Sequence, residues 1–573
     1  MKSVPDKATV QAQAKFKQAQ RIHQQGQPAR AKALLEAVIR MLPKHAEALM
    51  LLGLIAEQEN DLQAAADLVE RARSADPDNP VVHLCLGNIQ NKQKKLHDAS
   101  KSYSRAITLK ADFVDAYYNC GVVLQELKEF DVAMLCYDKV VSIKPDHFEA
   151  YNNRGNVLRD LKQFEEALKS FDKAISLKPD NADAYYNSAL VLQDLNELDA
   201  AMLCYDTALS LKPDLLQAYV NRSNTLKDLK RFDDALRSLD GAIVINPDFA
   251  EAHWNKSILL LLSGEFHEGW REFEWRWRWD KFPSPKRNFD QPLWTGNESI
   301  VGKTILLHSE QGLGDAIQFS RYAKLVSDAG FRVIFEVHRP LKSLFEHLSG
   351  VSQWVVMGDP LPPFDLHCPL LSLPFAFKTV ERTIPASVPY LSGNATKVSE
   401  FEIRLGERKA PRIGLVWSGN QQHTNDHNRS IKLSDLLQQL PEGYQYVSLQ
   451  KEIRPEDRAI LESRPDLLSF GSELNDFSDT AALCELMDII ISVDTSVAHL
   501  AGALGKKVWI LLPHMPDWRW LLDRDDSPWY PTATLYRQSS RGDWRGVLER
   551  VAADLQNEVS PALAFEASSA GPD

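Results

Sequence analysis

The sequence predicts two kinds of structure in one chain: an all-helical superhelix of repeated helix pairs, followed by an α/β region of two doubly wound units. Two observations support this fold class. In the first half of the chain, prolines and small residues recur at a constant interval of 34 residues. From residue 303 onward, short apolar segments of strand length alternate with segments of helical periodicity, and this pattern restarts once.

The 34-residue interval divides the first half of the chain into equal units. Six prolines lie on it, with Ala111 filling the one gap: Pro43, Pro77, Pro145, Pro179, Pro213 and Pro247. The grid gives eight units: 12–45, 46–79, 80–113, 114–147, 148–181, 182–215, 216–249 and 250–283. In the fourth unit, Tyr117, Gly121 and Leu124 share one helix face, and the small Gly121 is expected to let two helices approach closely. Each proline is expected to end the second helix of its unit, because it cannot continue a helix.

The period and the pattern of these units resemble the tetratricopeptide repeat, which implies that residues 12–283 form a tetratricopeptide superhelix with a concave groove. An asparagine recurs on the same grid: Asn119, Asn153, Asn187, Asn221 and Asn255. An amide both donates and accepts hydrogen bonds, so a row of amides can hold an extended peptide backbone. The layout of the chain resembles that of the O-linked N-acetylglucosamine transferases, and this resemblance implies that the five asparagines bind an acceptor protein. The alternative interpretation is that asparagine is simply common at this position of the repeat.

An aromatic and basic segment closes the repeats. Four tryptophans and three arginines fall between Trp270 and Trp279. The spacing of Trp270, Phe273 and Trp277 predicts a helix with aromatic side chains buried on one side, which docks the repeats onto the next region. Nucleic-acid binding is the alternative for such a mixture, but the net charge of −12 opposes it. Residues 284–302 are expected to be a linker.

Strand-like segments in the second half fall into two groups. The first group predicts an α/β unit over residues 303–395, with strands in 303–309, 332–338, 353–359 and 365–371. The second group predicts a unit over residues 411–558, with strands in 412–419, 444–450, 466–471, 488–494 and, as the last strand, 507–513. The tail, 559–573, is expected to be disordered. Two Rossmann-like units in tandem, without a complete G-x-G-x-x-G motif, resemble the GT-B glycosyltransferase fold, which implies an active site between the units.

The first candidate loop is Gly312-Leu313-Gly314-Asp315, between a predicted strand and a predicted helix. Its glycines allow the backbone to approach a substrate closely, and a carboxylate there can take a proton from an attacking hydroxyl. The loop resembles one in family 9 glycosyltransferases, the lipopolysaccharide heptosyltransferase group. The resemblance implies that Asp315 is the catalytic base and that Gly312 and Gly314 lie at the acceptor. The alternative is an aspartate that stabilises the first turn of a helix.

The second candidate loop is Asp494-Thr495-Ser496, with His499 one helical turn further on. The helix that begins here presents its N-terminal amides to a ligand, which suits a diphosphate. The segment resembles the D-T-G-x-x-H element of the same family, with Ser496 in the place of glycine, and this implies that Asp494, Thr495, Ser496 and His499 bind the donor nucleotide. The alternative is a helix cap with a core histidine.

The third candidate loop follows the segment 412–419. Ser418 and Gly419 end that segment, and Arg429 stands just ahead of a predicted helix, where the family usually places a basic residue that neutralises the leaving diphosphate. Gln450 and Lys451 end the next predicted strand. They resemble a glutamine and a lysine near the donor site of the O-linked N-acetylglucosamine transferases, so all five residues are expected to bind the donor. Further along, Trp518, Arg519 and Trp520 are expected near the edge of the same site.

Two groups of residues offer weaker metal-site hypotheses. His423, Asp426 and His427 have a spacing that matches no standard metal motif. The run from Asp523 to Asp525 is formally a D-x-D, but it follows the last predicted strand. No metal site and no cofactor are therefore expected, apart from a nucleotide-sugar co-substrate.

The resemblances together imply an inverting, metal-independent glycosyltransferase that moves a sugar from a nucleotide-diphosphate donor to a hydroxyl group, with the acceptor a protein recruited by the repeats. One alternative is a surface polysaccharide or lipopolysaccharide as acceptor. Another is a non-catalytic repeat scaffold with a nucleotide-binding α/β domain. Superhelices of this kind often self-associate, so a homodimer is also compatible with the sequence.

Cellular location is inferred from segments that the sequence lacks. The N-terminal residues have no apolar core of a secretory signal, and no apolar run reaches the length of a membrane span. The six cysteines have no C-x-x-C spacing. A cytoplasmic protein with reduced cysteines, no integral membrane segment and no nucleic-acid partner is expected.

Overall fold

The structure is a computed structural model that describes residues 7–296, 302–423 and 425–558. The chain divides into two compact units, the first ending at Lys230 and the second beginning at Arg231. Two of the sequence predictions concern residues outside the described ranges. They are the disordered tail 559–573 and, within the linker 284–302, residues 297–301.

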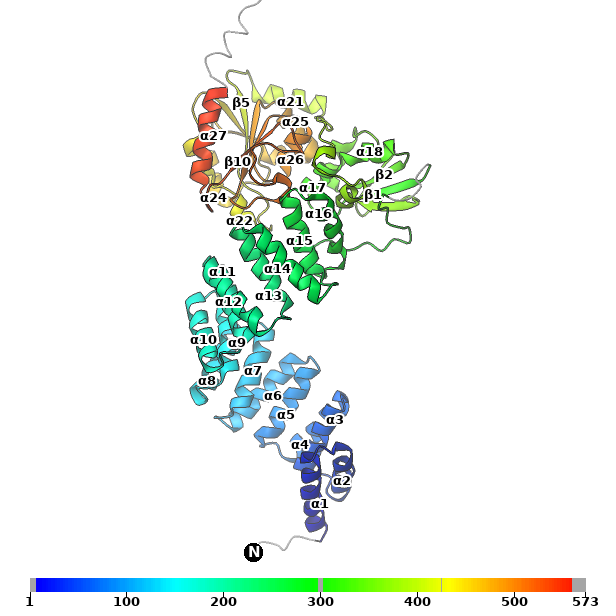
Figure 1. The fold of residues 1–573 in the computed structure, drawn as a ribbon, viewed down its shortest axis with the longest axis vertical. Helices are drawn as coiled ribbons and strands as arrows, with labels where there is room; N and C mark the ends of the chain where they lie inside the picture. Colours follow the sequence, from blue (N-terminus) through cyan, green and yellow to red (C-terminus); the bar gives the residue numbers. More distant parts are fainter. Residues whose placement is uncertain (1–6, 297–301, 424, 559–573) are drawn as a thin grey trace, which may run out of the picture. The chain divides into compact units, whose positions relative to one another are not determined.

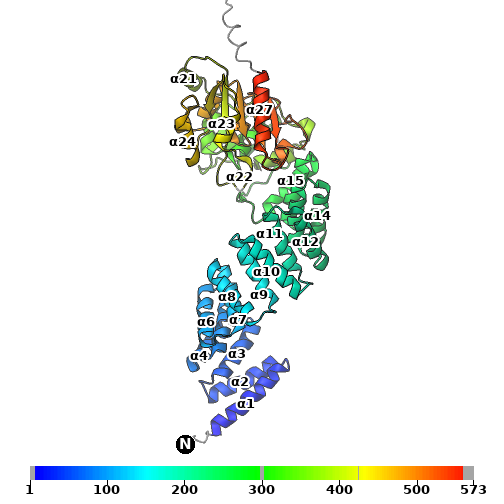
Figure 2. The ribbon, with the colours of Figure 1, turned by 90° about the vertical axis from the view of Figure 1, so that its left-hand side faces the viewer.

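The described part of the first unit is helical (Figure 1, blue through cyan to blue-green). Its helices are α1 (Lys7–Gln24), α2 (Pro28–Met41), α3 (Ala46–Gln58), α4 (Leu62–Ala75), α5 (Pro80–Lys92), α6 (Leu96–Leu109), α7 (Val114–Glu126), α8 (Phe130–Ile143), α9 (Phe148–Asp160), α10 (Phe164–Leu177), α11 (Ala182–Asp194), α12 (Leu198–Leu211) and α13 (Leu216–Asp228). Consecutive helices pack in pairs, and each pair packs against the next, as Figure 2 shows from a second side. The second helix of a pair ends two residues before a proline of the grid, as at Pro43 and Pro145.

Close packing explains the small residues of the repeat. A Cβ atom at Gly121 would lie 2.8 Å from Cε1 of Tyr137, and one at Gly155 would lie 2.5 Å from Cε1 of Phe171. Since real Cβ atoms do not approach other atoms this closely, a larger residue would displace the aromatic ring of the second helix. The predicted role of Gly121 in helix approach is confirmed.

The turn within each helix pair has a feature that the sequence analysis missed. One residue in each turn has a backbone φ between 59° and 82°: Gly26, Asn60, Lys94, Lys128, Lys162, Asn196, Lys230 and Gly264. These residues follow the same 34-residue interval as the prolines. Left-handed backbone is costly for residues other than glycine, so Lys94, Lys128 and Lys162 are held there by the packing of the helices they connect.

Helices also begin the second unit: α14 (Phe232–Ile245), α15 (Ala250–Leu262), α16 (Phe266–Phe273) and the 3₁₀ turn η1 (Glu274–Arg278). Trp270 is fully buried, and its ring lies edge-on to Trp518 at 5.2 Å between centroids and to Phe319 at 6.4 Å. Phe319 and Trp518 belong to the α/β part of the chain. The prediction that the aromatic segment docks the last repeat onto the following region is therefore confirmed.

The first sheet of the second unit contains β1 (Thr304–His308), β2 (Arg332–Val337), β3 (Gln353–Val356) and β4 (Leu366–Pro369). Its order is β3-β2-β1-β4, and all its strands are parallel. The connecting helices are α17 (Leu313–Phe319), α18 (Tyr322–Asp328), α19 (Lys342–Phe345) and α20 (Leu373–Ala376), with short 3₁₀ turns that include η4 (Glu381–Thr383).

The second sheet contains β5 (Arg412–Val416), β6 (Gln445–Ser448), β7 (Leu468–Ser469), β8 (Ile489–Val493), β9 (Val508–Leu512) and β10 (Ala533–Arg537). Around it lie α21 (Ala395–Leu405), α22 (Asp426–Arg429), α23 (Leu433–Gln439), α24 (Pro455–Ser463), α25 (Phe477–Glu485), α26 (Ser496–Ala503), the 3₁₀ turn η6 (Trp518–Trp520) and α27 (Trp544–Glu558). Every residue of β5, β8 and β9 is buried, as expected for the centre of a parallel sheet.

The strand order of the second sheet is β10-β9-β8-β5-β6-β7, all parallel. If the strands are numbered 1 to 6 from β5 to β10 and the sheet is read from β7, the order is 3-2-1-4-5-6, that of dinucleotide-binding α/β folds. The order reverses between β5 and β8. One expectation was wrong: 507–513 is not the last strand, because β10 follows it. The run from Asp523 to Asp525 therefore lies between two strands and not after the sheet.

Candidate active site

The candidate loops all follow the carboxyl ends of parallel strands. The loop with Asp315 follows β1, Ser418 and Gly419 follow β5, and Asp494 follows β8. Ligands of open α/β sheets bind at this edge, where the strand order reverses. The site expected from the sequence thus falls at the edge where the fold can hold a ligand.

Two of the loops are in direct contact, because α17 packs against α26. A Cβ atom at Gly314 would lie 2.9 Å from Cδ2 of His499 and 3.4 Å from the Cα of Ser496. Gly314 is therefore a glycine because α26 approaches its backbone. The contact brings the loop of the first sheet to the N-terminus of a helix of the second sheet.

The carboxylate of Asp315 has two partners. Its Oδ2 accepts a hydrogen bond from the backbone N–H of Gly312 at 2.8 Å, which caps the first turn of α17. Its Oδ1 forms an ion pair with the guanidinium group of Arg519, which follows β9. Burial raises the pKa of Asp315 above its ordinary value, against the lowering effect of Arg519. A carboxyl group with a raised pKa is a stronger base once it is ionised.

The third loop reaches the second through Arg429. Its Nη1 donates to the backbone carbonyl of Asp494 at 3.1 Å. A Cβ atom at Gly419 would lie 2.7 Å from Nη2 of Arg429, so this glycine makes room for the guanidinium group. Arg429 is the last residue of the short helix α22, and α23 begins only at Leu433, so it does not stand directly ahead of a helix as the sequence suggested.

Gln450 and Lys451 are placed differently from each other. The side-chain amide of Gln450 donates to the backbone carbonyl of Ser418 at 3.0 Å and accepts from its N–H at 3.4 Å, so it fixes the loop after β5. Lys451 is exposed, and its Nζ donates to the backbone carbonyl of Asn475 at 3.0 Å. Gln450 therefore supports the candidate site from behind, and the described contact of Lys451 is to a different loop.

His499 is a buried imidazole that contacts Tyr530 and Trp520. Its Nδ1 lies 3.0 Å from the hydroxyl of Tyr530, and its ring stacks on Trp520 at 5.3 Å between centroids. Burial, together with the charges of Arg519, Arg321 and Arg429, lowers its pKa well below the ordinary value. On the same segment, Thr495 Oγ1 lies 3.2 Å from Ser492 Oγ and does not cap α26.

The site combines carboxylates with donors that lack partners. Burial and the neighbouring Asp517 raise the pKa of Asp494 to about 6, although Arg429 opposes this. The buried Ser418 Oγ and Arg429 Nε have no hydrogen-bond partner among the described residues, although Arg429 Nε lies 3.7 Å from Asp426 Oδ1 in an ion pair. Buried polar atoms are normally satisfied, so two such donors beside the start of α26 fit an anionic ligand that would complete them.

Arg276 forms a buried ion pair near the candidate site that the sequence analysis did not single out. It is fully buried in η1, and its guanidinium group binds the buried carboxylate of Glu310, two residues ahead of Gly312. The arginine-rich segment was recognised as a docking helix, but no sequence signal identifies Glu310 as its partner.

The asparagines of the repeats use their amide donors within the protein. Each Nδ2 in the first unit donates to a side chain of the preceding helix pair: Asn119 to Asn88 at 2.9 Å, Asn153 to Tyr118 at 3.1 Å, Asn187 to Asn152 at 3.1 Å and Asn221 to Tyr186 at 2.8 Å. In the second unit, the Nδ2 of Asn255 donates to the carbonyl of Glu251 at 2.8 Å. One hydrogen bond from each of the first four amides therefore links neighbouring repeats, and that of Asn255 stays within its own helix.

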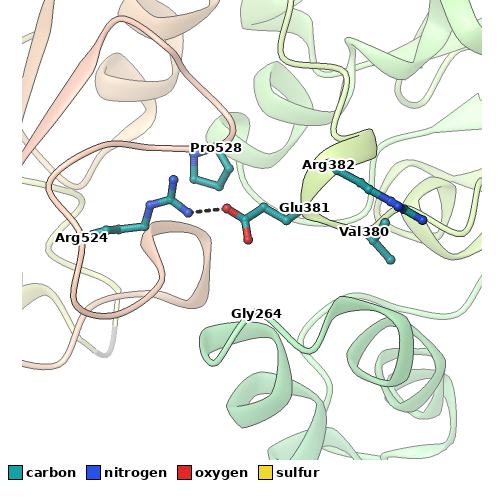
Figure 3. A pocket seen from close by; sticks show the side chains of 6 residues that line it. All are labelled: Gly264, Val380, Glu381, Arg382, Arg524 and Pro528. Atoms are coloured by element: carbon teal, nitrogen blue, oxygen red, sulfur yellow. Dashed lines mark hydrogen bonds and ion pairs between the residues drawn. The ribbon is translucent and has the colours of Figure 1, made fainter.

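A pocket of about 600 Å³ lies elsewhere in the second unit. Figure 3 shows its lining residues: Gly264, Val380, Glu381, Arg382, Arg524 and Pro528. Within it, Arg524 Nη1 and Glu381 Oε1 form an ion pair at 2.6 Å. None of the candidate catalytic or donor-binding residues lines this pocket, so it is separate from the site at the strand ends.

The described residues show neither a metal-binding cluster nor a membrane-spanning helix. No three His, Cys, Asp or Glu side chains there are grouped to hold a metal ion, and Asp426 is bound instead by Arg454 and Ser430. Among the same residues, no helix has both the length and the apolar character to cross a membrane. All six cysteines are free thiols.

Comparison with known families identifies the repeats. Models described as tetratricopeptide repeat match residues 16–80, 136–169, 114–147 and 182–215, and a model described as TPR repeat matches residues 87–128 and 155–196. The matches 114–147 and 182–215 have the same bounds as the fourth and sixth units of the proline grid. The N-terminal half of the chain therefore carries tetratricopeptide repeats.

The chain is similar to Protein FlbA of Caulobacter vibrioides, with 23% identity over 344 residues, which cover 52% of this chain and 54% of FlbA. It thus spans about half the length of this curated relative. Among solved structures, a tetratricopeptide repeat protein from Parabacteroides merdae is 21% identical, with a TM-score of 0.36. The match covers 40% of this chain and 91% of the Parabacteroides chain. MamA is 26% identical, with a TM-score of 0.28, and the match covers 29% of this chain and 96% of the MamA chain.

Proposed function

We propose that the chain is a tetratricopeptide-repeat glycosyltransferase that transfers a sugar, with inversion, from a nucleotide-diphosphate sugar to a hydroxyl group. The observation that supports this is the meeting of three loops at the carboxyl ends of two parallel sheets. They bring a partly buried carboxylate at Asp315, an arginine at Arg429 and the N-terminus of α26 into one region. A base, a cation and a helix N-terminus are the groups that this reaction needs.

The chemistry assigns a role to each group. The acceptor oxygen forms a new bond to the anomeric carbon, and its proton passes to the carboxylate of Asp315. The bond from that carbon to the diphosphate breaks on the opposite face of the sugar, and the diphosphate leaves with the electron pair. Arg429, the hydroxyl of Ser418 and the first amides of α26 stabilise the negative charge that develops on it, without a metal ion in the proposed step.

The repeats supply the acceptor in this proposal. Stacked helix pairs present extended surfaces that bind polypeptides, so the acceptor class is a protein. In Asn153, Asn187 and Asn221 one N–H of each amide is bonded to the preceding repeat, and the carbonyl oxygens are the groups that would receive hydrogen bonds from a peptide backbone. A carbohydrate acceptor, such as a surface polysaccharide, is the alternative within the same reaction class.

A second candidate function rests on one observation. The carboxylate of Asp315 both caps α17 and pairs with Arg519, a structural use that a protein without catalysis would also have. The chain would then be a repeat scaffold whose α/β part binds a nucleotide. The two functions differ only in whether a bound nucleotide sugar is turned over.

The test has two steps. A panel of nucleotide sugars is added to the full-length protein, and the ligand that binds the folded state raises its Tm. Sugar transfer from that ligand is then measured for the wild type, for Asp315→Asn and for Asp328→Asn, a matched control at an exposed carboxylate on α18.

Loss of transfer by Asp315→Asn alone, with the Tm increase retained, supports the enzyme and its base. Transfer that persists in this variant rules out Asp315 as the base. A Tm increase with no turnover by the wild type favours the scaffold.

A further inference from the structure

We propose that Arg519 exchanges partners during the reaction: it pairs with Asp315 while the donor site is empty, and with the donor diphosphate when it is filled. Asp315 is thereby released to act as the base only when the donor is present. This inference rests on the proposed function, since it concerns the same site. Arg519 is a positioning residue for Asp315 and a binding residue for the diphosphate.

The contacts of Arg519 place it between the two sheets. Nη1 binds Asp517 at 2.8 Å, Nε donates to Gln318 Oε1 at 2.7 Å, and Nη2 holds Asp315. Asp517 lies in the same connection as Arg519, whereas Gln318 and Asp315 lie on α17, the helix that follows β1. A single guanidinium group therefore joins the base-bearing helix to the loop after β9.

The surroundings of Arg519 favour an exchange of partners. Against the lowering effect of burial, the carboxylates of Asp517, Asp315 and Asp494 raise its pKa, so three anions compete for one cation. The Cζ atom of Arg519 also lies over the ring of Trp518, 4.3 Å from the ring centroid. This contact supports the guanidinium group in more than one hydrogen-bonding arrangement. Asp517 can keep its contact with Nη1 while Nη2 turns from Asp315 to a ligand.

Arg519 is close in space to the start of α26. The ring of its neighbour Trp520 stacks on His499 at 5.3 Å between centroids, and Gly314, beside Asp315, approaches both His499 and Ser496. Phosphate oxygens form bidentate pairs with arginine as readily as a carboxylate does. A diphosphate at the start of α26 would meet Arg519 on the side where it now holds Asp315.

Asp315 remains ordered after the exchange. Its second partner, the N–H of Gly312, holds the carboxylate at the start of α17 whether or not Arg519 is bound. The oxygen that Arg519 releases is then free to accept a proton. Binding of the leaving group and activation of the base are thus linked through one side chain.

The exchange predicts that removing the carboxylate of Asp315 strengthens the binding of a diphosphate. Inorganic pyrophosphate, used as the probe, is titrated into the full-length protein by calorimetry. Asp315→Asn is expected to tighten binding by roughly fivefold or more, because Arg519 no longer has to leave a carboxylate. Arg429→Gln, which removes the other cation, is expected to weaken binding, and this places the probe at the candidate site.

A double-mutant cycle separates the exchange from general electrostatics, because removing any negative charge favours an anion. In the Arg519→Gln background, Asp315→Asn is expected to change the affinity by less than about twofold. An equal gain from Asp315→Asn in both backgrounds overturns the exchange and leaves the proposed function intact. No pyrophosphate binding to the wild type overturns both.

Arg519 is buried, so Arg519→Gln can fail to fold. Arg519→Lys is the second variant for this reason: it keeps the charge but cannot hold Asp315, Asp517 and Gln318 with one planar group. The gain from Asp315→Asn is expected to be smaller in the Arg519→Lys background than in the wild type. An undiminished gain there overturns the exchange.

Discussion

Arg276 and Glu310 form a buried ion pair that joins the last repeat helices to the loop carrying Asp315. Nη2 of Arg276 lies 3.0 Å from both carboxylate oxygens of Glu310, and Ser372 Oγ accepts a further hydrogen bond from the same nitrogen at 2.7 Å. Glu310 also accepts a hydrogen bond from the backbone N–H of Leu371 at 3.2 Å. The pair thus ties η1 to the ends of β1 and β4.

Removing one member of this pair is expected to destabilise the second unit. Arg276→Met leaves the carboxylate of Glu310 buried without a cation, which costs about 3–5 kcal/mol. Denaturant unfolding followed by tryptophan fluorescence measures the loss. Arg278→Met is the matched control: Arg278 pairs with the exposed Asp248, so the expected loss is below about 1 kcal/mol. Equal losses for the two variants would show that the buried pair contributes nothing special.

The left-handed turns predict substitutions of opposite effect. Lys128 has a φ of 62°, so Lys128→Gly is expected to stabilise the protein by about 1 kcal/mol. Gly264 has a φ of 82° and open space around its Cα, so Gly264→Ala is expected to destabilise it by a similar amount through backbone strain alone. Both changes are measured as shifts in the denaturant midpoint. Shifts of the same sign for both variants would contradict this account of the turns.

The capping residue of α25 predicts a loss of stability in acid. Burial alone would raise the pKa of Asp476, but hydrogen bonds from Ser343 and Ser478 and the charge of Lys397 hold it at about 2. A carboxyl group whose pKa is lowered on folding stabilises the protein above its unfolded pKa, and this stability disappears as the pH falls through about 4 to 2.

Asp476→Asn isolates that charge, because asparagine also caps helices well. The variant is expected to be less stable than the wild type by about 2 kcal/mol at pH 7, and equal to it near pH 2. Free energies of unfolding at several pH values measure the difference. A difference that does not change with pH would show that the charge has no part in it.

The asparagine ladder predicts energetic coupling between neighbouring repeats. Asn153 Nδ2 donates to the hydroxyl of Tyr118 in the preceding helix pair, so Asn153→Ala and Tyr118→Phe should each cost about 1 kcal/mol. Their double variant should cost less than the sum, by about 0.5–1 kcal/mol. Additive losses in unfolding experiments would mean that this hydrogen bond does not stabilise the stack.

Local signals made the helical half predictable. The prolines end helices and Gly121 admits the ring of Tyr137, and both effects depend on residue types that the sequence displays directly. The lysines at the turns were missed because lysine carries no preference for left-handed backbone, and only the packed helices impose it. β10 was missed because its five residues include Thr534 and Arg537 and lack a continuous apolar run.

The candidate site was predictable in its loops but not in its contacts. Parallel strands end at one edge, so residues that follow β1, β5 and β8 were expected together. Arg519 and Asp315 are 204 residues apart, and no spacing rule pairs them. The same limit applies to Gln450, whose amide supports Ser418 from behind although its position suggested a ligand contact.

The burial of Trp270 and Arg276 sets where this chain can be cut or recombined. A fragment that begins at residue 284 would expose Phe319 and Trp518 to water and leave Glu310 without its cation, even though every strand of both sheets is retained. A fragment that begins at Arg231 keeps these contacts, because α14 to η1 belong to the same compact unit as the sheets. The helices from α14 to η1 must therefore be kept with the α/β region when the chain is shortened.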